Sequence, residues 1–196
     1  DDDGVWRPLD PHLAQLESLG LGRQVDDWLL DGALRHDLGN ARLSLRLSAA
    51  ALLRDDFLDG LRACLLRSRL PTSQLCIAVD EAFIVDHPQR AAALRELLSP
   101  FACSLAIDRY RGGSGLTALR LFPANYIRLH ESLVSRVATD LVDRAHLEWL
   151  VTAARLVGAK TVACAVRDAD TQERMRLAKV DYVQGYAVAP PTPFSS

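Results

Sequence analysis

Short apolar runs and longer segments with helical spacing alternate along the chain. Six runs rich in apolar and β-branched residues predict buried strands, at residues 42–48, 74–79, 102–107, 125–129, 160–166 and 181–183. Apolar residues that recur every three or four positions predict helices over residues 12–35, 55–68, 88–99, 131–157 and 169–178. Pro88 stands where the third helix should begin, a position that tolerates its missing N–H.

This alternation of strand and helix predicts an α/β fold. Parallel neighbours need a long crossover, so strands separated by helices are expected to pair in parallel. Periodicity alone leaves open an α/β barrel and an open doubly wound sheet. At 196 residues, with 49% apolar side chains, the chain has the size of one domain with a sizeable core.

The composition argues against several classes of protein. A net charge of -2 argues against a general nucleic-acid-binding surface, which shows as a basic excess. No stretch reaches the roughly 20 apolar residues needed to cross a bilayer, and the opening DDDGVWRPLD lacks the apolar core of a signal peptide. The four cysteines are widely spaced with no CxxC pair, which favours free thiols in a reducing compartment over a disulfide framework. We therefore expect a soluble domain.

Charged and polar side chains gather where the predicted strands end, and in an α/β barrel these ends carry the chemistry. They are Arg46, Ser48, Asp80, Glu81, Asp108, Arg109, Arg128, His130, Cys164, Arg167 and Gln184. Two divalent metal ions would require more carboxylates than this set offers. Its four arginines suit an anion better, because guanidinium groups bind phosphate bidentately. The alternative is structural: the arginines form salt bridges, and Asp80 and Glu81 cap a helix.

Six motifs at these strand ends follow one another in a recognisable order. They are LRLSAAAL, IAVDEAF, IDRYRGG, NYIRLHESLV, TVACAVRD and DYVQGYAVAPP. In order and spacing they resemble the EAL family of cyclic-di-GMP phosphodiesterases, whose corresponding segments read vNlS, lEitE, DDFGTG, DyiKIDrsfv, vvAEGVEt and d.vQGyl.srP. The resemblance extends over residues 2–191.

Most of the family's metal-binding and catalytic positions are replaced in this sequence. The replacements are Arg46 for Asn, Ala78 for Glu, Arg109 for Asp, Arg128 for Lys, His130 for Asp, and Cys164 and Arg167 for two glutamates. The retained residues are Ser48, Glu81, Asp108 and Gln184. A shift of one residue would let Asp108 take either acidic position of its motif.

The resemblance implies a TIM-like (β/α) barrel of the EAL type, formed by residues 1–191, with a loosely ordered tail at residues 192–196. The EAL tripeptide itself would precede residue 1. We therefore expect the first strand of the barrel to be missing or irregular, and the domain to belong to a longer signalling protein.

The replaced positions lead to two functional hypotheses, both for a bacterial, cytoplasmic regulatory domain that is not an enzyme and holds no metal or cofactor. In the first, the domain is a cyclic-di-GMP receptor whose ligand-binding residues are Arg46, Ser48, Glu81, Asp108, Arg109, Arg128, Arg167 and Gln184. In the second, it is an adaptor that binds a protein partner and has lost nucleotide binding. A receptor should show arginines converging on a cleft. An adaptor should show an exposed apolar patch, and its arginines should pair with acids such as Asp55, Asp56 or Asp140. A homodimer is compatible with both.

Overall fold

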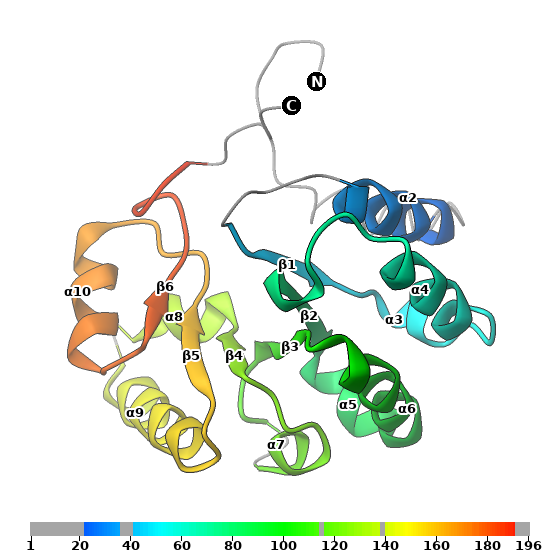
Figure 1. The fold of residues 1–196 in the computed structure, drawn as a ribbon. Coiled ribbons are helices and arrows are strands. Elements are labelled where there is room, and N and C mark those ends of the chain that lie inside the picture. Colours follow the sequence, from blue (N-terminus) through cyan, green and yellow to red (C-terminus); the bar gives the residue numbers. More distant parts are fainter. Residues whose placement is uncertain (1–21, 36–40, 114–115, 138–139, 191–196) are drawn as a thin grey trace.

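A parallel sheet of six strands forms the centre of the computed structural model, which describes residues 22–35, 41–113, 116–137 and 140–190 (Figure 1). The strands are β1 (Leu43–Arg46), β2 (Leu75–Asp80), β3 (Ser104–Tyr110), β4 (Tyr126–Leu129), β5 (Lys160–Ala163) and β6 (Tyr182–Val183). Each strand pairs with the next in chain order, so β1 and β6 are the two edges. All six predicted strands are confirmed.

Helices surround the outside of the curled sheet (Figure 1). They are α2 (Gly22–Arg35), α3 (Ala49–Leu52), α4 (Phe57–Leu66), α5 (Glu81–Asp86), α6 (Pro88–Leu98), α7 (Thr117–Leu121), α8 (Glu131–Arg136), α9 (Leu141–Leu156) and α10 (Ala169–Leu177), with short 3-10 turns at Thr72–Gln74 and Ser99–Phe101. This arrangement confirms the TIM-like α/β fold. None of the described helices is long and apolar enough to cross a membrane.

The described part of the sheet is an open, barrel-like curl. A closed barrel of this class has eight strands, and the described residues supply six. No described strand precedes β1, and the first strand that was expected to be missing or irregular lies outside the described residues. Residues 1–21 and the predicted tail at 192–196 lie outside the described residues.

Alternate residues of the strands face opposite sides of the sheet, and the two sides differ in character. On the side that joins the main core, Leu75, Ile77 and Val79 of β2 are buried. On the other side the residues are smaller or polar, and Cys76 of β2 lies beside Ser104 of β3 in register. Interiors of closed barrels are filled by bulky branched residues. The small residues here leave a hollow of about 150 Å³ inside the curl.

The helix predicted over residues 131–157 is wrong in one respect, because two helices occupy that range. α8 ends at Arg136, and α9 begins after Asp140, whose carboxylate accepts hydrogen bonds from the N–H groups of Val142 and Asp143. An aspartate with extended backbone at this position starts a new helix. The short helices α3, α5 and α7 were not predicted, because four to six residues are too few to show helical periodicity.

Gly60 of α4 offers a stabilising substitution. It lies on the exposed side of the helix, and a Cβ atom built there meets no atom within 4 Å. Alanine exceeds glycine in helix propensity by about 1 kcal/mol. We therefore expect Gly60→Ala to raise the free energy of unfolding by about 1 kcal/mol, measured by urea denaturation. A decrease would show that the helix is packed against something at this position.

Candidate functional site

An ion triad lies toward the carboxyl ends of β1, β3 and β4. Asp108 of β3 is buried, and its carboxylate accepts a hydrogen bond from Arg128 Nε of β4 at 2.8 Å. Arg46, the last residue of β1, places its guanidinium 3.6 Å from the other carboxylate oxygen. The parallel register brings the ends of β1, β3 and β4 to one edge of the sheet, so residues far apart in sequence meet there. Two guanidinium groups thus flank one buried carboxylate.

A second polar network surrounds the start of α5. Asp80 caps the helix by accepting the N–H of Ala82 at 2.8 Å, and it also pairs with Arg109. The buried Glu81 accepts the backbone N–H of Arg111 at 2.8 Å. Arg109 has a φ of 49°, in the left-handed region, at the point where the β3–β4 register shifts. The capping role foreseen as the structural alternative for Asp80 is therefore confirmed.

His130 connects this network to α8. Its Nε2 lies 2.6 Å from the guanidinium of Arg111, and its Nδ1 accepts a hydrogen bond from the N–H of Ser132 at the start of the helix. A neutral imidazole can accept a hydrogen bond at one nitrogen, whereas a protonated one accepts none. Partial burial and the neighbouring Arg111 lower the pKa of His130 below 6.5. The neutral ring can accept at one of the two nitrogens and the protonated ring at neither, so these contacts favour the neutral form.

The lowered pKa of His130 predicts a pH dependence of stability. In the unfolded chain the ring takes up a proton near pH 6.5, while in the folded protein it does so only at lower pH. The stability that the lowered pKa of His130 contributes is thus fully present above pH 6.5. It is lost as the pH falls through the pKa of His130 in the folded protein. Urea denaturation between about pH 7.5 and about pH 5.5 should show this loss. It should be smaller in His130→Gln, and equal losses in the two proteins would contradict the assignment.

The other predicted ligand-binding residues lie further from the ion triad. Ser48 caps α3 and donates a hydrogen bond at 2.6 Å to Asp26 of α2. Arg167 is exposed and lies 3.6 Å from Glu131. Gln184 follows β6, where its backbone pairs with Ala163 and Val166. The structure therefore brings Arg46, Asp108 and Arg128 into direct contact. The contacts described for Ser48, Arg167 and Gln184 are with other residues.

Two residues of this region were missed by sequence reasoning. Arg111 contacts both Glu81 and His130, and it is not among the candidate residues chosen from the sequence. Arg111 directly follows β3, but the predicted strand ended at residue 107, so the signal of its place at a strand end could not be seen in the sequence. Asp26 is buried and holds Ser48. An acid within a helix that precedes the first predicted strand carries no such signal.

The carboxylates of this site do not fit a pair of divalent metal ions. Metal-assisted hydrolysis needs several oxygen ligands converging on the ions. Asp108 instead faces two guanidinium groups, Asp80 faces another, and Glu81 accepts a backbone N–H. Within the described ranges, no group of three or more His, Cys, Asp or Glu side chains is placed to hold a metal ion.

Comparison with known proteins places the fold in a family. A family model described as "EAL domain" matches residues 2–191. The chain belongs to the EAL domain family. Its curated relatives include MucR of Pseudomonas aeruginosa, named a bifunctional diguanylate cyclase/cyclic di-GMP phosphodiesterase, at 28% identity over 90% of this chain and 27% of the relative. Another is the cyclic di-GMP phosphodiesterase PdeB of Shewanella oneidensis, at 26% identity over 65% of this chain and 15% of the relative. The EAL-type chain thus spans about a quarter or less of these relatives.

Solved EAL structures have the same fold. A complex of the Pseudomonas aeruginosa MucR phosphodiesterase with c-di-GMP superposes with a TM-score of 0.85 at 26% identity, over 95% of this chain and 78% of that one. The EAL domain of FimX from the same organism, bound to c-di-GMP, has a TM-score of 0.83 at 22% identity, over 97% and 79%. The similarity to FimX shows the fold alone.

Proposed function

We propose that this EAL domain is a non-catalytic receptor that binds cyclic-di-GMP without metal ions. The ion triad carries the proposal, because the guanidinium groups of Arg46 and Arg128 lie against Asp108 where the family resemblance implies metal ligands. The two guanidinium groups, which are part of the protein, then take the place of metal ions that could exchange with the solvent. Hydrolysis by metal-activated water requires a bound divalent ion, and the remaining carboxylates are already engaged.

Arg109 of β3 and Arg167, which follows β5, offer guanidinium groups to the phosphates of a ligand. The side chain of Arg109 is 56% exposed and that of Arg167 is 76% exposed, each paired with one carboxylate. The pair of Arg167 with Glu131 is exposed on both sides and contributes only about 0–1 kcal/mol, so a phosphate can replace Glu131 at little cost. Arg46 and Arg128 remain paired with Asp108. The c-di-GMP complex of the MucR relative supports this choice of ligand.

Calorimetric titration tests the proposal. Cyclic-di-GMP is added to the protein first with a chelator and then with manganese, and the mixture is assayed for the linear dinucleotide. We expect micromolar binding in the chelator and no linear product in manganese. Arg109→Ala with Arg167→Ala should weaken binding at least about tenfold, which is the loss of about 1.4 kcal/mol. Arg90→Ala, which removes a half-buried guanidinium paired with the exposed Asp55, is the control. No heat at millimolar ligand, or turnover with manganese, would overturn the proposal.

A second function, protein binding, is favoured by the surface of α9. Leu141, Trp149 and Leu156 are 76%, 45% and 84% exposed, and spacings of seven and eight place them along one side of the helix. Exposed apolar patches of this kind mark interaction sites. The pairing of each predicted arginine with an acid also fits an adaptor, although the partners are Asp108, Asp80 and Glu131 rather than the acids expected.

The adaptor reading has its own test. Sedimentation velocity shows whether a second copy covers the α9 surface, and Leu141→Glu with Leu156→Glu should then release monomers. If the protein is monomeric and silent toward cyclic-di-GMP, capture of a partner that is lost in the same double variant would favour the adaptor. Nucleotide binding that survives unchanged in the double variant would separate the two functions.

A further inference from the structure

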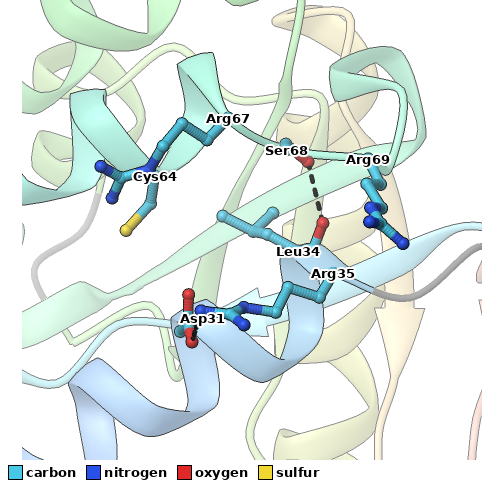
Figure 2. A pocket seen from close by; sticks show the side chains of 7 residues that line it. All are labelled: Asp31, Leu34, Arg35, Cys64, Arg67, Ser68 and Arg69. Carbon is cyan, nitrogen blue, oxygen red and sulfur yellow. Dashed lines mark hydrogen bonds and ion pairs between the residues drawn. The ribbon is translucent and has the colours of Figure 1, made fainter.

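A polar hollow, separate from the one inside the curl, lies at the opposite end of the sheet from the ion triad. It has a volume of about 340 Å³ and opens between the last turn of α2, the end of α4 and the connection from α4 to β2 (Figure 2). Connections that lead into parallel strands lie at the amino ends of those strands, whereas the ion triad lies at the carboxyl ends. The two regions are therefore separate, and the hollow is outside the site described above.

The floor of the hollow is tied together by hydrogen bonds. The carbonyl of Leu34, near the end of α2, accepts the N–H groups of Arg69 and Leu70 at 3.0 and 3.4 Å. The hydroxyl of Ser68 lies 3.3 Å from the same carbonyl and 2.8 Å from the carbonyl of Leu70. These bonds fix the backbone from which Arg67 and Arg69 extend. Figure 2 shows the two side chains on opposite sides of Leu34.

The described side chains that line the hollow carry a net positive charge. Arg35 is paired with Asp31 at 2.7 Å, so their charges compensate each other. Arg67 and Arg69 are exposed, and neither forms an ion pair with any acid in the described part of the chain. A cation at the end of α4 can be explained by the helix dipole, which attracts basic residues to a C-terminus. That explanation covers Arg67 at the C-cap, but not Arg69, which lies two residues beyond it.

We propose that this hollow binds a small polyanion with at least two phosphate groups. Guanidinium groups bind phosphate through paired hydrogen bonds, and two of them on opposite sides of a hollow suit an anion with separated charges. The volume falls within the range of about 300–1,000 Å³ found for small-molecule pockets, larger than one phosphate needs. Among the described residues that line the hollow none is aromatic, so these side chains offer no surface on which a base could stack and would recognise the phosphates.

Cys64 provides a reporter of occupancy, because it lines the hollow. Burial raises the pKa of the other three thiols, those of Cys76, Cys103 and Cys164, and the pKa of Cys103 reaches about 11. Those thiols should therefore react slowly with an alkylating reagent, since the thiolate is the nucleophile. Alkylation by iodoacetamide, followed by peptide mapping, reports on Cys64 with the other cysteines as internal references.

The experiment compares alkylation with and without inorganic pyrophosphate. We expect pyrophosphate at ten times its dissociation constant to slow the reaction of Cys64 about tenfold and to leave the other cysteines unchanged. Orthophosphate at the same concentration should protect less. ADP and GDP in parallel distinguish a nucleoside diphosphate from the inorganic ion, and equal protection by all three diphosphates places recognition in the phosphates alone.

Variants make the outcome specific. Arg67→Gln with Arg69→Gln should abolish the protection of Cys64, whereas Arg62→Gln, an exposed arginine on α4 outside the hollow, should preserve it. Unchanged rates at millimolar pyrophosphate, or protection that persists in the double variant, would overturn the proposal. Binding of cyclic-di-GMP should be the same in the double variant and in the unmodified protein. If it is lost, cyclic-di-GMP itself occupies this hollow, and the carboxyl-end receptor site is wrong instead.

Discussion

Arg128→Met is expected to lower the free energy of unfolding by about 3 kcal/mol, one of the two largest effects predicted for a single substitution in this protein. Asp108 is buried, and its side chain is only 8% exposed. Removal of one partner from a buried ion pair leaves an uncompensated charge, which typically costs 3–5 kcal/mol. Arg46 stays within 3.6 Å of Asp108, so the low end of that range applies.

A double-mutant cycle separates the loss of the ion pair from the loss of packing. Asp108→Asn removes the charge, so Arg128→Met should cost much less when it is made in that background. Arg167→Met is the control, because that guanidinium is 76% exposed and its pair with Glu131 contributes about 1 kcal/mol at most. Urea denaturation measures the four proteins of the cycle and the control variant. Equal costs of Arg128→Met in the two backgrounds would show that the Arg128 stem, and not its charge, stabilises the fold.

The strands of this domain could be predicted from sequence because each is a short apolar run bounded by polar residues. The six predicted ranges differ from the observed strands mainly at their ends, as in β3, which continues through Tyr110 instead of ending at residue 107. That extension contains Arg109 in a left-handed conformation. A β-bulge of this kind depends on the neighbouring strand, so no local pattern reveals it.

The candidate site could be predicted only in part. Sequence identified which residues stand at the strand ends, and Arg46, Asp108 and Arg128 do meet. It could not show that the arginines pair with acids of the same rim, because pairing depends on side-chain directions across three strands. The acids chosen as alternative partners lie elsewhere: Asp55 pairs with Arg90, and Asp56 with Arg54. Nor could sequence show that Ser48 caps α3, because that helix is too short to predict.

Gly185→Ala is expected to destabilise the protein by about 3 kcal/mol, through strain at the last strand. Gly185 has a φ of 153°, and a Cβ atom built there would overlap the backbone N and O atoms of Val166 and lie 2.8 Å from its carbonyl carbon. The N–H and carbonyl groups of Val166 form hydrogen bonds with residues before and after the glycine. The N–H of Val166 donates to Gln184, and the carbonyl of Val166 accepts the N–H of Ala187. The backbone must move to admit a methyl group, and both hydrogen bonds are then weakened.

Gly158→Ala distinguishes this close contact from conformational preference alone. Gly158 also has a positive φ, of 77°, but a Cβ atom there meets nothing within 4 Å, so only the cost of the left-handed conformation, about 1 kcal/mol, applies. Thermal or urea denaturation compares the two variants. A similar loss in both would mean that the segment after β6 yields easily to the added methyl group. A larger loss in Gly185→Ala would show that the backbone contact with Val166 holds this segment, and with it Gln184, at the carboxyl edge of the sheet.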